Sequence, residues 1–176
     1  MKKLLIICLL FPFIAVSQTQ IKVDPWIPFQ SFIGEWTGQG GGEPGKGNYE
    51  RSYKFILSGK FIEVRNKSTY PPTASNPKGE VHEDLGYFSY DRSLKKIRLR
   101  QFHIEGFVNQ YLLDSISPDQ KTIVFVTESI ENIPAGWKAK ESYRILSEIE
   151  LEETFELAEP GKGYEVYSKV LLKKVR

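Results

Sequence analysis

The residues of this chain best suited to do chemistry are polar side chains that interrupt the apolar face of an alternating segment. In such a segment every second side chain points the same way, so a polar residue on the apolar parity is directed into the interior. The residues of this kind are Arg51, Gln101, His103, Glu141 and Glu153. Because burying a lone charge is costly, we expect Arg51 to pair with Glu141 or Glu153, with Gln101 and His103 completing a hydrogen-bonded set.

These inward polar residues have two interpretations. In the functional one, they hold the polar end of a small ligand whose apolar body lies on neighbouring side chains. The predicted ligand-binding residues are then Arg51, Tyr53, Gln101, His103, Glu141, Tyr143 and Glu153, with further apolar contacts from Tyr49, Phe55, Ile97, Leu99 and Phe155. In the structural interpretation, the same polar residues form an internal ion-pair network and bind nothing.

His103 could also serve as a general base oriented by Glu141 or Glu153, or as a metal ligand. The only other histidine, His82, stands in a segment without periodicity, and the chain has no H-x-H or H-x-x-x-H spacing. The G-x-S-x-G motif of serine hydrolases is absent as well. The sequence therefore predicts neither a catalytic residue nor a metal site.

The elements that must position these residues are short segments of period-two alternation, rich in Val, Ile, Tyr, Phe and Thr. About ten strands are predicted, at Phe32–Gly40, Asn48–Leu57, Lys60–Tyr70, Asp84–Tyr90, Lys95–Ile104, Phe107–Asp114, Thr122–Ile130, Gly136–Leu146, Glu148–Leu157 and Tyr164–Val175. Most connections are too short for parallel crossovers, and they join antiparallel neighbours. We expect an all-β domain, a single closed or nearly closed antiparallel up-and-down barrel, because closure removes the exposed edges.

Two segments interrupt the meander. Residues 18–31 precede the barrel domain (32–176), and their apolar, proline-punctuated part predicts a short plug under one barrel end, anchored by Trp26 and Phe29. The stretch from Pro71 to Glu83 has no periodicity and predicts a mobile loop near one mouth, a candidate lid.

The first strand contains Gly34-Glu35-Trp36-Thr37-Gly38-Gln39-Gly40. The G-x-W part resembles the signature of lipocalins and their fatty-acid-binding relatives, the calycins, in which the tryptophan closes the barrel floor. The extended form G-x-W-x-G-x-G resembles nitrobindin-type haem-binding barrels and related exported bacterial proteins. We expect the glycines to permit strand curvature and close approach at a barrel corner.

The resemblance to nitrobindin-type barrels implies a haem held by a histidine on the last strand. That strand has no histidine here, which disfavours haem, although Tyr167 stands roughly at the ligand position. Alternation places Tyr167 with Lys169 and Lys173 on the outward face, away from the interior. The cofactor is thus left open.

Residues 1–17 have the basic head, short apolar run and small-residue exit of a signal peptide, with Cys8 inside the apolar run. Its removal takes Lys2 and Lys3 and brings the formal charge from +2 to zero, leaving no basic patch for nucleic acid and no stable membrane anchor. We therefore expect a cysteine-free protein exported to the periplasm or the extracellular space. The oligomeric state is left open.

Three functions follow from these observations. The leading one is a lipocalin-like barrel that binds a small apolar or amphipathic molecule in its interior. The second is a nitrobindin-type haem protein acting on reactive nitrogen species. The third is a non-catalytic interaction domain whose barrel is fully packed by aromatic side chains, which would leave no cavity for a ligand.

Overall fold

The fold is described here from a computed structural model, which describes residues 24–74 and 76–175. The predicted signal peptide and residues 18–23 of the plug segment lie outside this range. The strands are β1 (Gly34–Gly42), β2 (Gly47–Ile56), β3 (Phe61–Tyr70), β4 (Glu80–Asp91), β5 (Lys96–His103), β6 (Val108–Ile116), β7 (Thr122–Glu131), β8 (Lys138–Ser147), β9 (Glu150–Ala158) and β10 (Glu165–Lys174). No helix within the described residues is long and apolar enough to cross a membrane.

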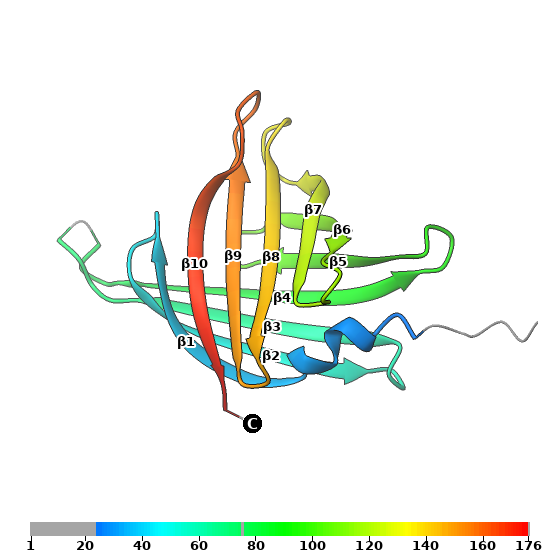
Figure 1. Cartoon of the computed structure of the whole chain (residues 1–176). Helices are drawn as coiled ribbons and strands as arrows, with labels where there is room; N and C mark the ends of the chain where they lie inside the picture. Colours follow the sequence, from blue (N-terminus) through cyan, green and yellow to red (C-terminus); the bar gives the residue numbers. More distant parts are fainter. Residues whose placement is uncertain (1–23, 75, 176) are drawn as a thin grey trace, which may run out of the picture.

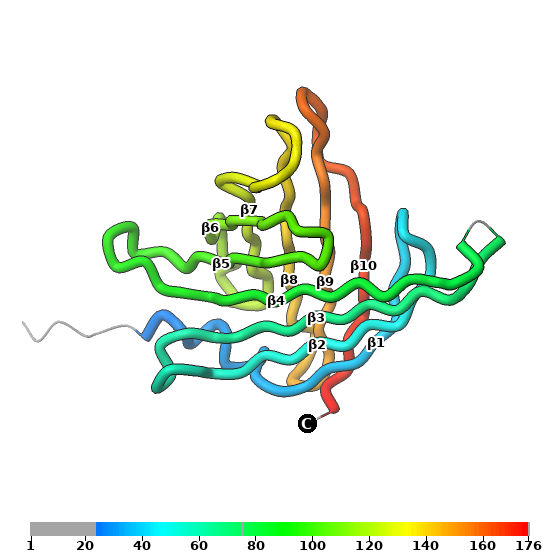
Figure 2. Tube along the Cα trace, turned by 180° about the vertical axis from the view of Figure 1, so that it is seen from behind, coloured from blue at the N-terminus to red at the C-terminus, as the bar shows by residue number. Residues whose placement is uncertain are grey.

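The ten strands form one closed antiparallel barrel, as the alternation predicted. Each strand pairs with its neighbour along the chain, and β1 pairs with β10 to close the ring. The barrel is flattened, so that the strands of its first half cross those of its last half (Figure 1). The β3–β4 turn projects from the body of the barrel in both views (Figures 1 and 2).

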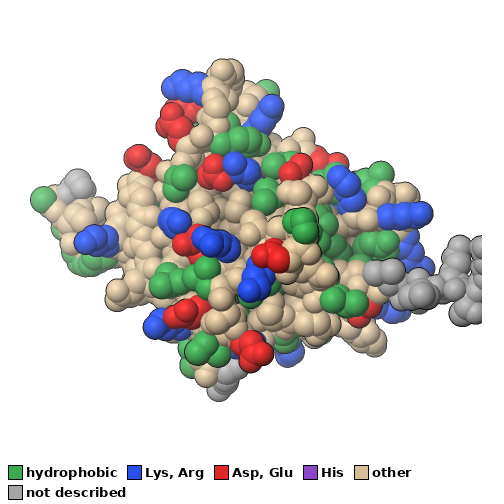
Figure 3. Space-filling view, in the orientation of Figure 1, with side chains coloured by type: hydrophobic (Ala, Val, Ile, Leu, Met, Phe, Trp, Pro, Cys, Tyr) green, Lys and Arg blue, Asp and Glu red, His purple; other side chains and the backbone are tan. Residues whose placement is uncertain are grey.

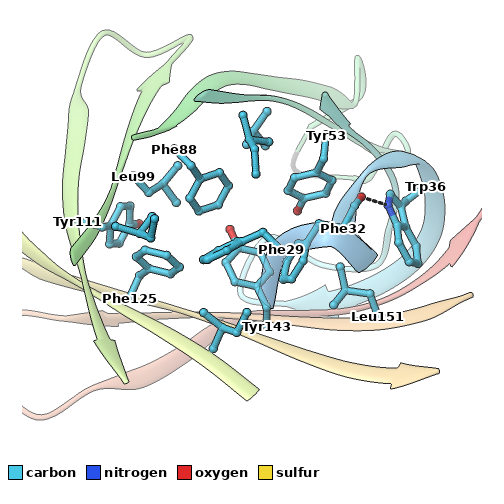
Figure 4. Close-up of a cluster of buried hydrophobic side chains, with 14 of the residues drawn as sticks. Phe29, Phe32, Trp36, Tyr53, Phe88, Leu99, Tyr111, Phe125, Tyr143 and Leu151 are labelled. Atoms are coloured by element: carbon cyan, nitrogen blue, oxygen red, sulfur yellow. Dashed lines mark hydrogen bonds between the residues drawn. The ribbon is translucent and has the colours of Figure 1, made fainter. Parts of the chain in front are cut away.

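A short 3-10 helix, η1 (Ile27–Phe32), plugs one end of the barrel. Its Phe29 and Phe32 are buried completely or nearly so, and Trp26 just before it is also buried. The ring centroid of Phe29 lies 5.4 Å from that of Phe88, and the centroid of Phe32 lies 5.2 Å from that of Tyr143. Figure 4 shows these rings filling the barrel interior around the helix. The predicted plug and both of its anchors are therefore confirmed.

The G-x-W motif ties the plug to the barrel wall. Trp36 is buried, and its indole Nε1 donates a 2.8 Å hydrogen bond to the backbone oxygen of Phe32 (Figure 4). Two residues on, a Cβ on Gly38 would lie 2.1 Å from the carbonyl oxygen of Leu171 on β10. Glycine is thus needed for close approach at the seam that closes the barrel.

The outer surface carries charges of both signs side by side. Ion pairs join Lys140 to Glu156 and Lys169 to Glu152, across neighbouring strands of the last half. Lysine or arginine side chains accordingly lie next to acidic ones on the face shown in Figure 3. These surface pairs contribute little to stability compared with the core.

Strand β4 begins four residues earlier than the sequence predicted. Residues Val81, His82 and Glu83, assigned to the loop from Pro71 to Glu83, pair instead with Thr69, Ser68 and Lys67 of β3. The sequence of residues 81–83 lacks strong alternation. These residues nevertheless pair with β3, because β3 extends to Tyr70 and continues the same register. The connecting turn is therefore only residues 71–79, and His82 lies on the barrel wall.

Candidate functional site

The end of the barrel opposite the plug encloses a cavity of about 540 Å³. Its apolar wall includes Tyr49, Tyr70, Phe107, Trp137, Phe155 and Leu157. Its polar wall includes Arg51, Asp84, Gln101, His103, Glu141 and Glu153. The volume is within the usual range of about 300–1,000 Å³ for small-molecule sites.

An ion pair crosses the floor of this cavity. Arg51 Nη2 lies 2.7 Å from Glu153 Oε1, and Arg51 Nε lies 3.1 Å from Glu153 Oε2, in a bidentate arrangement. The remaining guanidinium nitrogen, Nη1, donates hydrogen bonds to the backbone oxygens of Glu50 and Lys67. Of the two partners predicted for Arg51, Glu153 is the one that forms the ion pair. All three guanidinium nitrogens of Arg51 donate hydrogen bonds.

Glu141 faces the same cavity and is not paired. It is 4 % exposed, and its carboxyl group makes no side-chain hydrogen bond or ion pair within the described residues. Burial, reinforced by the negative charge of Glu153, raises the pKa of Glu141 well above its usual value. Burial therefore favours the protonated form of Glu141, which can donate a hydrogen bond to a ligand as well as accept one.

A second polar cluster lies on the cavity wall formed by β4 and β5. The Nε2 atom of His82 lies 3.6 Å from Asp84 Oδ2 and 3.5 Å from His103 Nδ1. The three residues bring one ligand atom each to within 4.8 Å of one another, which makes them a candidate metal-binding set. Asp84 and His103 are directly opposite across the β4–β5 ladder, and His82 shares the inward face of β4.

The two histidines of this cluster have opposite pKa shifts. Burial lowers the pKa of His103, so its imidazole is neutral near pH 7. The carboxylate of Asp84, followed by that of Glu105, raises the pKa of His82. The ring of His103 also stacks on Phe107 with centroids 4.1 Å apart, which holds its plane.

Five of the seven predicted site residues line the cavity: Arg51, Gln101, His103, Glu141 and Glu153. Tyr53 and Tyr143 lie below it and pack on Phe32 of the plug. Of the other predicted apolar contacts, Tyr49 and Phe155 line the cavity, whereas Phe55, Ile97 and Leu99 do not. Alternation identifies the inward face of a strand, but it does not indicate how far along the strand the plug reaches.

The predicted hydrogen-bonded set is only partly present. No side-chain hydrogen bond joins Gln101 or His103 to the pair of Arg51 and Glu153 within the part of the chain that the structure describes. His103 instead contacts His82 and Asn109. The inward face of β5 was identified correctly, but His82, which lies beside His103, had been assigned to a loop.

Tyr167 also lines the cavity, although alternation placed it on the outward face. The cause is an irregularity in β10, where the register with β9 shifts between Val166 and Ser168. Tyr167 is the extra residue of this bulge, and its ring packs edge-on against Phe155 with centroids 5.7 Å apart. A bulge of this kind has no clear signal in the local sequence.

One comparison with a solved structure supports the fold. No protein-family model matches the chain, and no curated protein matches it. The crystal structure of Rv2717c from M. tuberculosis superposes with a TM-score of 0.67 at 18% identity, covering 88% of this chain and 99% of that one. A protein of unknown function from the DUF3598 family of Nostoc punctiforme gives a TM-score of 0.29 at 6% identity, covering 87% of this chain and all of that one.

Proposed function

We propose that this protein is an exported, lipocalin-like carrier that binds one small amphipathic molecule in the cavity opposite the plug. The observation that carries the proposal is the combination of a cavity of about 540 Å³ with a buried, unpartnered Glu141 in its wall. A buried polar group without a partner costs free energy, and a ligand that supplies a hydrogen bond recovers it.

The ligand's polar end is an uncharged group such as a hydroxyl, carbonyl or amide. Arg51, the one cation among the cavity-lining residues that the structure describes, already has its charge neutralised by Glu153. An anionic head group would therefore approach Glu153 and Asp84 without a free positive partner. The apolar body of the ligand would lie against Tyr49, Trp137 and Phe155 nearer the mouth.

The residues of the last strand do not fit a haem group. Iron ligation by a tyrosine requires the deprotonated phenolate. Burial raises the pKa of Tyr167, and Tyr70 and the acidic side chains of Glu80, Glu105 and Glu43 raise it further. β10 therefore offers a phenol held in its protonated form. The fully packed interaction domain is likewise not supported, because the barrel contains a cavity of about 540 Å³.

The test begins with the untagged protein purified from an exporting host. Mass spectrometry of its organic extract should reveal one co-purifying amphipathic molecule. In a competition assay, dodecan-1-ol should displace the neutral fluorophore N-phenyl-1-naphthylamine more effectively than dodecanoate at pH 7. A carrier function is contradicted if the extract is empty and neither compound displaces the probe.

A pair of variants connects binding to the proposed group. Glu141→Leu should weaken dodecan-1-ol binding by about tenfold, because it removes the hydrogen-bonding group. Glu63→Gln, on the outer face of β3, should bind like the natural protein. Titration with hemin serves as a further check, and a Soret band would revive the haem alternative.

A further inference from the structure

We propose that His82, Asp84 and His103 form a binding site for a first-row divalent cation, Zn²⁺ above all, on the wall of the cavity. This inference does not depend on the carrier function, since a cation needs no organic ligand to bind there. It also departs from the prediction that the chain has no metal site, which was made with His82 assigned to a loop.

The spacing of the ligand atoms matches a metal site. Two ligands held about 2.0–2.1 Å from a tetrahedral zinc ion lie about 3.4 Å apart. The Nε2 atom of His82 lies 3.6 Å from Asp84 Oδ2 and 3.5 Å from His103 Nδ1. Two edges of the coordination polyhedron are thus nearly at their final length, and little movement is needed to bind the ion.

The surrounding residues orient two of the ligands. Glu105 Oε1 lies 2.7 Å from His82 Nδ1, which places the ring proton on Nδ1 and leaves the Nε2 lone pair facing the cluster. Asn66 Nδ2 donates a 2.7 Å hydrogen bond to Asp84 Oδ1 and leaves Oδ2 free. A carboxylate behind a histidine and a hydrogen bond behind a carboxylate are the usual outer partners of metal ligands.

The buried side chain of Asn109 contacts His103, the third ligand, and gives separate support for the site. Its Nδ2 lies 3.1 Å from His103 Nε2 and 3.0 Å from Tyr111 Oη, while its buried Oδ1 has no partner. If the amide turns over, Oδ1 accepts from His103 Nε2–H and from the Tyr111 hydroxyl. That tautomer of His103 presents its Nδ1 lone pair to the cluster. Because Asn109 is only 1 % exposed, its buried amide favours this tautomer once it has turned over.

The charge balance also favours a cation. Arg51, the nearest positive side chain on the cavity wall, is neutralised by Glu153. Asp84 and Glu105 then add negative charge with no other cation among the described cavity-lining residues. Three protein ligands leave a coordination position open, and here it faces the cavity. A water molecule or the polar end of a bound molecule would complete the coordination.

The test uses untagged mature protein stripped with a chelator, so that no affinity tag contributes histidines. Isothermal titration with Zn²⁺ should show one site per chain with a Kd below about 1 µM, and Co²⁺ should give visible d–d absorption bands. Because the chain has only two histidines, one-dimensional NMR should show both ring signals shifting together with Zn²⁺. Absence of stoichiometric binding, or ring signals that do not move, would overturn the proposal.

Variants locate the site. Asp84→Asn and His103→Gln should each weaken Zn²⁺ binding by at least about 100-fold. Glu105→Gln should weaken it by about 10- to 100-fold, because His82 Nδ1 loses the carboxylate that orients its ring. The matched control is Glu83→Gln, an exposed carboxylate between His82 and Asp84 on the opposite face of the same strand. Binding that survives Asp84→Asn, or that falls equally in Glu83→Gln, contradicts the site, and near-UV circular dichroism establishes that each variant is folded.

Discussion

The two ends of the barrel are built from the same strands but filled in opposite ways. At the plugged end, Phe29 and Phe32 pack against the surrounding rings in tilted and edge-to-face contacts and leave no room for a ligand. At the open end, the same inward parity carries Arg51, Glu141 and Glu153 around a cavity. The plugged end supplies the stability that the open end, with its buried charges, does not.

The largest effect is expected from the plug itself. Phe29→Ala removes a fully buried ring and should reduce the free energy of unfolding by about 3–5 kcal/mol. Phe155→Ala removes a phenyl ring of the same size from the cavity wall. It should reduce the free energy of unfolding clearly less, because the Phe155 ring is only partly buried. Urea denaturation measures both, and equal losses would mean that the two ends contribute alike.

The ion pair at the cavity floor should come next. Arg51→Met leaves Glu153 buried without its partner and should cost about 3–5 kcal/mol. The double variant Arg51→Met with Glu153→Leu should recover most of that loss, since two apolar side chains replace the pair. Thermal unfolding of the three proteins checks this. A double variant no more stable than the single one would show that the pair itself stabilises the open end.

The pH dependence of stability isolates Glu141. Its pKa is higher in the folded protein than in the unfolded chain, so the folded state keeps its proton as the unfolded state loses it. Stability should therefore fall as the pH rises from about 4.5, with a slope of up to about 1.4 kcal/mol per pH unit, until the folded group also ionises. In Glu141→Gln this contribution to the slope should vanish. Unfolding curves at several pH values measure it, and an unchanged slope would contradict a neutral Glu141.

The smallest change is expected at the boundary between the two ends. The hydroxyl of Tyr53 is buried without a hydrogen-bond partner. Tyr53→Phe deletes that oxygen and keeps the ring, so it should leave stability unchanged or raise it by about 1 kcal/mol. A melting temperature several degrees lower would mean that the hydroxyl has a partner in solution.

Much of this architecture could be predicted from the sequence. Period-two alternation identified Arg51, Gln101, Glu141 and Glu153 as inward. It could do so because alternate side chains of each barrel strand point to the interior and to solvent. The apolar segment around Trp26 and Phe29 indicated the plug. Alternation carries no information about depth along a strand, so Tyr53 and Tyr143 were assigned to the binding site although the plug covers them.

The metal-binding set could not be predicted, for a different reason. His82 and Asp84 are brought beside His103 by the pairing of β3 with β4 and of β4 with β5. His82 lies in a segment that follows two prolines and has no clear period, whereas Asp84 was the first residue of the predicted strand. The extension of β4 along β3 leaves little trace in the local sequence. The H-x-D spacing on one strand face was a usable signal once the strand itself was known.

The glycine-lined seam between β1 and β10 has a consequence for how the chain acquires its structure. These strands come from opposite ends of the domain, so the barrel cannot close until nearly the whole chain has been synthesised. Pairings so distant in sequence are slow to form. Until β10 arrives, the edges of β1 and β9 are open to strands of other molecules, and a chain truncated before Glu165 should aggregate rather than fold.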